Sequence, residues 1–123
     1  ELPGDLPFHQ DAGLNAVIIR NMRKHTSDDQ ILTGEMSVAA GDIGDVGCFF
    51  PTIQFGYTGF DGYCHGKDMC VIDENEVYAV PCDIVVSSVT DLLDHPEEVL
   101  EIRRNFKPSI TREAYLRHLE VHQ

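Results

Sequence analysis

The sequence predicts an α/β fold with few strands, and three observations carry this prediction. Apolar residues recur at helical spacing near the start and through the second half of the chain, they alternate over a short stretch near the middle, and glycine-rich segments flank that stretch. These patterns indicate a partial sheet, one long kinked helix and short C-terminal helices. One or two strands cannot cover the apolar side of a long helix, so we expect a part of a larger domain.

The N-terminal part of the chain predicts one helix between two irregular segments. Residues 1–11 contain prolines and a glycine and read as a loop or the remnant of a preceding element. Helical spacing of apolar residues predicts a helix over residues 12–24. Residues 30–32 are compatible with a strand edge, and residues 33–48, rich in glycine and small side chains, predict an irregular loop whose backbone closely approaches a neighbouring group.

The middle of the chain predicts a strand followed by a glycine-rich loop. Ile53, Phe55 and Tyr57 alternate with other residues over positions 51–57, which is typical of a half-buried strand. Several glycines follow, and His65 lies among them. We therefore expect this histidine in a loop directly after a strand.

The longest predicted helix ends at about Asp94. Asp73 has the character of an N-cap, and Glu76, three residues later, completes the pattern of a capping box. Pro81 falls inside the helix and should kink or split it, because proline lacks an N–H and crowds the preceding turn. The long helix should therefore be irregular near its start.

Two short helices are expected at the C-terminal end. Pro96 suits the first position of one helix, because the missing N–H of proline costs nothing there. Pro108 ends that segment, and Thr111 is placed to cap a last helix.

Charge and hydropathy exclude two classes of partner. The net charge is −12, and nine Lys and Arg residues do not form a basic stripe, so we expect no nucleic-acid partner. No apolar run approaches the roughly 20 residues that span a bilayer, so we expect no membrane partner.

The four cysteines favour reduced thiols over two disulfides. Cys48, Cys70 and Cys82 stand close to apolar residues, and a free cysteine behaves as a small buried hydrophobe. Buried, reduced thiols are usual in the cytoplasm, which is the location we expect.

His65 is the residue with the clearest chemical potential. Glycines at positions 62 and 66 let the backbone bend so that an imidazole can be aimed at a metal ion. By itself such a histidine is more often a loop residue that makes a hydrogen bond. A zinc knuckle with Cys64 and Cys70 lacks the usual ligand spacing, and Cys64 is too close to His65 in sequence to use it as a catalytic base.

Asp42 and Asp45 are candidates for active-site loop support. Aspartates between glycines most often accept hydrogen bonds from loop amides, although the pair could also act as metal ligands or as a general acid and base. We favour the supporting role.

Motifs along most of the chain from about residue 12 resemble a family of zinc amidohydrolases and metallopeptidases. The family contains aminoacylases and aminobenzoyl-glutamate hydrolases. The matching segments are Gly41-Asp42-Ile43-Gly44-Asp45-Val46 with Pro51-Thr52, Gly62-Tyr63-Cys64-His65-Gly66-Lys67-Asp68, Asp91-Leu92-Leu93, Asn105-Phe106-Lys107-Pro108 and Tyr115-Leu116. Gly41 and Cys48 depart from the aminobenzoyl-glutamate branch, where a serine and a bulky aromatic residue occur.

The resemblance implies that residues 12–123 form the C-terminal segment of a metallopeptidase catalytic domain. In the family, two divalent metal ions activate the water that attacks an amide carbonyl. His65 matches the last metal ligand, and the chain has no counterpart of the catalytic base. The implied substrate is an N-acyl amino acid or a small peptide-like amide. The implied metal is zinc, with manganese or cobalt as alternatives, and it should not bind tightly to this chain alone.

The implied partners follow from the missing ligands. The chain would be an inactive fragment or subunit, completed by the missing N-terminal part of the catalytic domain or by another copy in a homo-oligomer. A stand-alone α/β interaction module without metal chemistry is the alternative. A small hydrolase that builds its site from two chains is a third possibility.

Overall fold

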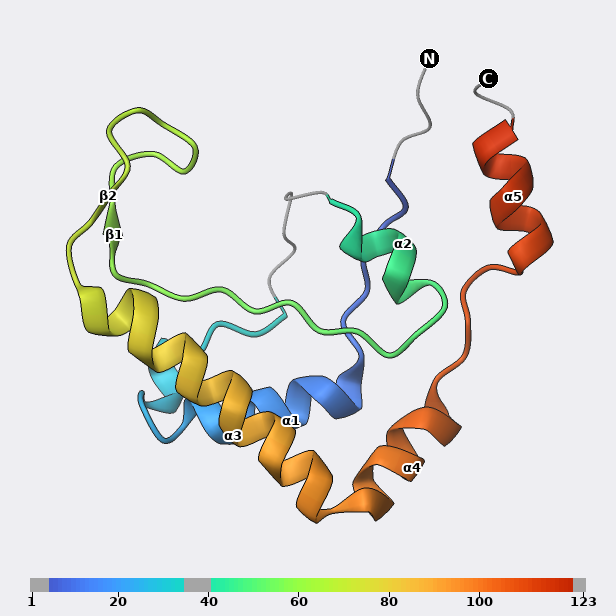
Figure 1. Cartoon of the computed structure of the whole chain (residues 1–123), viewed down its shortest axis with the longest axis horizontal. Helices are drawn as coiled ribbons and strands as arrows, with labels where there is room; N and C mark the ends of the chain where they lie inside the picture. The colour runs from blue at the N-terminus through green and yellow to red at the C-terminus, as the bar shows by residue number, and fades with distance from the viewer. Residues whose placement is uncertain (1–4, 35–40, 121–123) are drawn as a thin grey trace. The chain divides into compact units, whose positions relative to one another are not determined.

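A computed structural model describes residues 5–34 and 41–120, and within these ranges the chain is mostly helical (Figure 1). It contains five α-helices and one two-stranded antiparallel sheet. This composition agrees with a mixed α/β fold, with a smaller share of strand than the sequence pattern suggests.

Two compact units interleave along the sequence. The first unit combines Glu1–Asn15, Leu32–Gln54 and Glu97–Gln123, and the second combines Ala16–Ile31 and Phe55–Pro96. Each unit is therefore built from segments that lie far apart in the chain.

The first unit contains three helices joined by irregular segments. These are α2 (Ile43–Gly47), α4 (Pro96–Asn105) and α5 (Arg112–Glu120). The Ser109 N–H donates to the Cys48 carbonyl over 3.1 Å, which connects the segment after α4 to the end of α2. Cys48 and Ile102 supply buried apolar side chains, as expected for residues that close a small core.

The C-terminal helices confirm the sequence prediction. Pro96 is the first residue of α4, and α5 follows Thr111, whose hydroxyl accepts a hydrogen bond from the Ala114 N–H at 3.2 Å. This is N-cap geometry, because the threonine satisfies an amide that has no partner inside the helix.

The prediction of an irregular loop over residues 33–48 was wrong at its C-terminal end, where α2 forms, while residues 35–40 lie outside the described ranges. Gly44 explains how this short helix is accommodated. A Cβ atom at Gly44 would overlap the carbonyl oxygen of Leu6. The close backbone approach expected for this segment is therefore confirmed at Gly44, although the backbone there is helical.

The strand predicted over residues 51–57 was also wrong, because this segment pairs with a side chain in place of a second strand. The Thr52 carbonyl accepts a hydrogen bond from the Asp11 N–H at 2.9 Å. Beyond it, the amide side chain of Gln10 both accepts from the Gln54 N–H and donates to the Gln54 carbonyl. The glutamine satisfies the backbone groups that a strand ladder would otherwise use.

In the second unit, residues 16–22 of the first helix lie against the long helix. The helix predicted over residues 12–24 is confirmed as α1 (Ala12–Met22), and the long helix is confirmed as α3 (Val80–Asp94). No strand forms at residues 30–32, since a 3-10 turn over Asp28–Gln30 leads into them. Val17 and Ile18 of α1 and Ile84 of α3 are buried apolar residues of this unit.

A short hairpin precedes the long helix. Its strands are β1 (Phe60–Asp61) and β2 (Cys70–Val71), which pair antiparallel with Phe60 opposite Val71. The sheet is therefore smaller than expected and begins three residues after the predicted strand ends.

The start of the long helix forms half of the predicted capping box. The Asp73 carboxylate accepts hydrogen bonds from the N–H groups of Asn75 at 3.0 Å and Glu76 at 3.1 Å. The Asp73 N–H donates to the Gly59 carbonyl at 3.2 Å, so it does not need the side chain of Glu76. The cap thus connects the helix to the hairpin.

Pro81 changes the geometry of the helix, as its sequence position predicts. A π-helical turn, η2 (Asn75–Ala79), precedes it, and regular α-helix begins at Val80. Proline provides no N–H for the carbonyl of Val77 and its ring crowds that turn, so a wider turn accommodates it.

The thiols are free, but most of them are not buried. Cys48 is buried, whereas Cys64, Cys70 and Cys82 are exposed. The expectation that Cys70 and Cys82 are buried was wrong, because Cys70 lies in a two-stranded sheet without a covering layer and Cys82 lies on the outer side of α3. Among the described residues, no helix is both long enough and apolar enough to cross a bilayer.

Candidate functional site

His65 occupies the loop that connects β1 to β2, where its backbone adopts a left-handed conformation. Its φ angle is 62°, and among the described residues it is the only non-glycine residue with a positive φ. Left-handed backbone is costly for a side chain with a Cβ atom, and such residues concentrate at functional sites. The loop therefore displays the imidazole at an energetic cost.

Glycines hold this loop in a tight turn. Gly62 has a φ of 85°, and a Cβ atom there would overlap the carbonyl of Asp68 across the loop. A Cβ atom at Gly66 would overlap the Asp68 carboxylate and come within 2.8 Å of the Tyr63 carbonyl oxygen. Side chains are excluded at both positions, so the backbone around His65 is sterically defined.

The His65 imidazole is available for a ligand. The residue is exposed, and within the described part of the chain no side chain or backbone group forms a hydrogen bond or ion pair with its ring. Neutral imidazole nitrogen is a common ligand of zinc and related ions. His65 fits the role of one metal ligand by its chemistry and its exposure.

One ligand does not make a metal centre. Residues 5–34 and 41–120 contain no group of three or more His, Cys, Asp or Glu side chains arranged to hold an ion. A zinc site normally uses three or four protein ligands. Among these residues, His65 is therefore not accompanied by the further ligands that such a site uses.

Asp42 and Asp45 lie together at α2 in the first unit, whereas His65 belongs to the second unit. Asp42 occupies the N-cap position of α2 without a side-chain capping bond, and its backbone carbonyl accepts from the Val46 N–H. Asp45 is half-buried and accepts a long hydrogen bond, 3.4 Å, from the Leu6 N–H. The Asp45 side chain therefore accepts a hydrogen bond from a loop amide, as expected for a supporting residue, whereas the Asp42 side chain does not cap α2.

The charges near α2 also act on Tyr115 of α5. Its ring packs edge-on against Phe49, with ring centroids 5.3 Å apart. Burial, followed by the charges of Asp45, Cys48 and Asp42, raises the pKa of the Tyr115 hydroxyl. Tyr115 therefore stays neutral over the physiological range and acts here as a packing residue.

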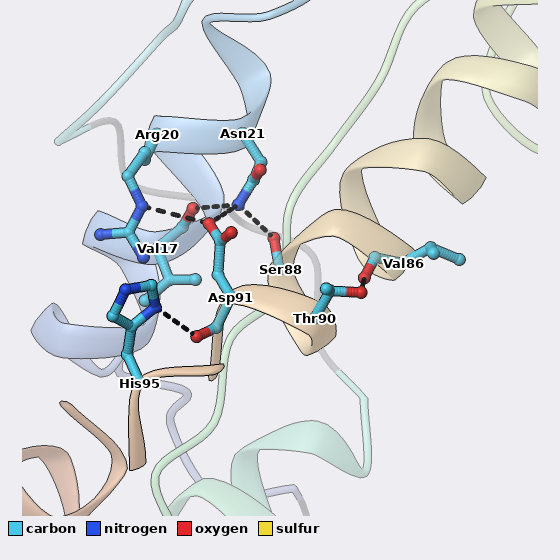
Figure 2. Close-up of polar contacts among 8 residues, drawn as sticks. All are labelled: Val17, Arg20, Asn21, Val86, Ser88, Thr90, Asp91 and His95. Atoms are coloured by element: carbon cyan, nitrogen blue, oxygen red, sulfur yellow. Dashed lines mark hydrogen bonds and ion pairs between the residues drawn. The ribbon is translucent and has the colours of Figure 1, made fainter. Parts of the chain in front are cut away.

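A buried polar cluster between α1 and α3 was not anticipated from the sequence. Figure 2 shows Asn21 of α1 pointing toward Ser88 and Asp91 of α3. The Asn21 Nδ2 atom lies 3.1 Å from Ser88 Oγ and 2.9 Å from Asp91 Oδ2, and it also donates to the Val17 carbonyl at 3.0 Å. Asn21 is fully buried, so these bonds form in a poorly hydrated environment.

The nitrogen and the oxygen of the Asn21 side-chain amide differ in their hydrogen bonding. Its two N–H hydrogens serve three acceptors, while its buried Oδ1 atom has no hydrogen-bond partner among the described residues. Rotating the amide by half a turn would bring Oδ1 against the Asp91 carboxylate, which repels it. The orientation is therefore fixed by Asp91, although a buried oxygen without a partner costs about 1–3 kcal/mol.

Asp91 connects the cluster to a surface cation. The hydrogen bond from Asn21 lowers the pKa of the Asp91 carboxyl, partial burial raises it, and the nearby Arg20 and Lys24 lower it further. The Arg20 guanidinium lies 3.2 Å from Asp91 Oδ2. Because the folded state lowers this pKa, the stabilisation is complete above the unfolded value of about 3.9 and is lost as the pH falls through the lower folded value.

The buried residues of α3 are thus the apolar Ile84 and the polar Ser88, whereas other apolar residues of the helix are exposed. A row of five exposed residues, which we name the α3 stripe, runs along the outward side at helical spacing: Cys82, Val85, Val86, Val89 and Leu93. Val86 is 63% exposed and Leu93 is 76% exposed. The available sequence signal was the spacing of Ser88 and Asp91, which places both polar side chains on one side of the helix near the buried Ile84.

Comparison with known proteins returned no match: no protein-family model, curated protein or solved structure corresponds to this chain. The fold and its geometry define a mostly helical, mixed α/β chain with a displayed histidine in a short hairpin. They also define an outward-facing apolar helix surface.

Proposed function

We propose that the chain is a fragment or subunit of a metal-dependent amidohydrolase, and that His65 supplies one ligand of its metal centre. The observation that carries this proposal is the geometry of His65. Its imidazole is exposed and has no hydrogen-bond or ion-pair partner among the described residues, and its backbone has a φ of 62° in a tight loop that needs glycine at positions 62 and 66. The motif Gly62-Tyr63-Cys64-His65-Gly66-Lys67-Asp68 around it, with its resemblance to the zinc amidohydrolases, gives the reaction class.

The proposed chemistry is hydrolysis of the amide bond of an N-acyl amino acid or a small peptide-like substrate. Zinc, or manganese or cobalt in its place, would lower the pKa of a bound water and polarise the amide carbonyl. The remaining ligands and the general base would come from an N-terminal part of the catalytic domain or from another copy of the chain. The 123-residue chain alone is then inactive.

Replacement of His65 by alanine tests the assignment. In the polypeptide that also carries the N-terminal ligands, His65→Ala should remove one equivalent of metal and lower amidase turnover by at least about a hundredfold. The fold should be retained, because His65 is exposed and alanine carries a similar left-handed strain. Metal content by mass spectrometry and amidase kinetics on the same samples measure both effects.

His9→Ala is the matched control, since His9 is also an exposed histidine and lies outside the β1–β2 loop. It should change neither metal content nor turnover. Wild-type turnover in the His65→Ala protein would refute the assignment. In the isolated chain, a stoichiometric submicromolar zinc site that depends on His65 would instead favour a site shared between copies.

The exposed α3 stripe favours a second candidate, a stand-alone interaction module without metal chemistry. Monomeric proteins seldom expose a continuous row of aliphatic side chains, and such a surface usually marks a contact with another molecule. Under this candidate His65→Ala has no effect on any activity, whereas substitutions in the α3 stripe abolish partner binding.

A further inference from the structure

We infer that the α3 stripe binds an amphipathic helix of a partner chain, with apolar side chains on its contacting face and Lys or Arg along the edges. This inference deepens the interaction role and is independent of the proposed metal role of His65. The apolar residues of the stripe indicate an apolar contacting face on the partner, and the acidic residues beside the stripe indicate basic edges.

The shape of the surface suits a helix. Successive members of the stripe are one, three or four positions apart in the sequence, so they form a continuous ridge along about three turns of α3. A second helix can pack its own apolar row against such a ridge, with axes about 8–10 Å apart. Apolar area of this kind contributes about 25 cal/mol per Å² removed from water.

The charge of the surface selects the partner. From residue 68 to residue 96 the sequence contains seven Asp and Glu residues and no Lys or Arg. Asp83 and Asp94 each directly follow a stripe residue, so both lie along the same edge of the stripe. Asp83 lies 2.8 Å from His25, while the exposed Asp94 carboxylate has no ion-pair partner among the described residues.

A second copy of the chain is a poorer occupant for the same reason. Two copies would bring a net charge of −12 each to the contact and would place acidic edges beside each other. Like charges facing one another across an interface oppose association, whereas opposite charges at helix edges determine the choice of partner. The contact is therefore heterotypic.

Two synthetic helical peptides test this inference on the full 123-residue chain. They share one Leu/Val face and differ only at the flanking positions, which carry Lys in one peptide and Glu in the other. We expect the Lys-edged peptide to bind at least about tenfold more tightly, measured by fluorescence anisotropy. Its affinity should fall as salt is raised, because exposed charges are screened within about 10 Å at 0.1 M salt.

The cysteines locate the contact within the same experiment. Bound Lys-edged peptide should slow the alkylation of Cys82 by iodoacetamide, while Cys64 and Cys70, which are exposed outside the stripe, continue to react at the unbound rate. Mass spectrometry after digestion with a protease that cleaves before aspartate measures the three rates separately, because cleavage at Asp61, Asp68, Asp73 and Asp83 places each thiol on its own fragment. Equal protection of all three thiols would contradict binding at the stripe.

Substitutions separate the contributions of the apolar and the charged residues to peptide affinity. Val89→Asp in the stripe should reduce binding at least about tenfold, whereas Ile72→Asp, at an exposed apolar residue outside α3, should leave it unchanged. Asp94→Asn should weaken binding of the Lys-edged peptide and reduce its salt dependence. Circular dichroism establishes that each variant is folded.

Several outcomes would overturn the inference. Equal affinity for the two peptides would show that charge does not select the partner. Concentration-dependent protection of Cys82 without peptide, together with dimers in sedimentation, would assign the surface to a second copy. Failure of these tests leaves the His65 proposal unaffected, and peptide binding by the His65→Ala variant should equal that of the wild type.

Discussion

Substitution of Asn21 by aspartate is expected to be the most damaging single change in the second unit. The side chain is fully buried and its Nδ2 atom lies 2.9 Å from the Asp91 carboxylate. Asn21→Asp replaces this donor by a second carboxylate of nearly equal size. An uncompensated buried charge costs about 3–5 kcal/mol, so we expect the free energy of unfolding at pH 7 to fall by that amount.

The pH dependence of this variant distinguishes charge repulsion from a simple packing defect. Burial and the neighbouring Asp91 should raise the pKa of the introduced carboxyl above its unfolded value of about 3.9. The variant should therefore be least destabilised below that unfolded pKa, where the carboxyl is protonated in both states, and its defect should grow as the pH rises through the raised folded pKa. Urea denaturation across this pH range measures the difference.

Asn75→Asp provides the matched control, because it makes the same chemical change at an exposed position in the same unit. Asn75 lies in the first turn of the long helix, where a negative charge is favourable, so a change within about 0.5 kcal/mol is expected. A pH-independent loss in Asn21→Asp would contradict the role assigned to the Asn21–Asp91 contact.

Alanine at Gly59 is expected to give the second-largest loss of stability. Gly59 is buried, its φ is +102°, and its carbonyl accepts the N–H groups of Ile72 and Asp73. An added Cβ atom would lie 2.8 Å from the Asp73 carbonyl oxygen and 2.8 Å from a methyl carbon of Val77. Backbone strain and overpacking each cost about 1–3 kcal/mol, so the sum should be about 2–6 kcal/mol.

Gly56→Ala is the control for this prediction. A Cβ atom at Gly56 meets nothing within 4 Å, and its φ is not in the left-handed region. Reduced freedom of the unfolded chain should leave that variant neutral or up to about 1 kcal/mol more stable. Denaturant titrations of both variants, with hydrogen exchange of the α3 amides, test whether Gly59 holds the hairpin against the helix start; equal stabilities would rule that out.

The helices could be predicted from the sequence because their signals are local. Periodic apolar residues, the Asp73 cap, Pro96 at a first helical position and the Thr111 cap each act within one or two turns of chain. The position of His65 in a glycine-rich loop was predictable for the same reason, since the glycines around it define the turn. These features were determined by the sequence by itself.

The tertiary structure decided which neighbours these elements use. Residues 51–57 have the alternation of a strand, yet the amide of Gln10 occupies the place of a neighbouring strand and the ladder does not form. The small residues around Gly44 predict a close backbone approach, yet only the structure shows that the segment is helical and that Leu6 is the neighbour. Strand pairing and close approach depend on residues far away in sequence, which local pattern cannot supply.

The same distinction applies to α3. Its sequence predicts a helix whose apolar side one or two strands cannot cover. The structure decides which residues of the helix are buried, because Asn21 of α1 lies against Ser88 and Asp91. Ile84 is also buried, while the α3 stripe faces outward. A hydrogen-bonded cluster needs both helices to form, and only their packing reveals which side of α3 remains for another molecule.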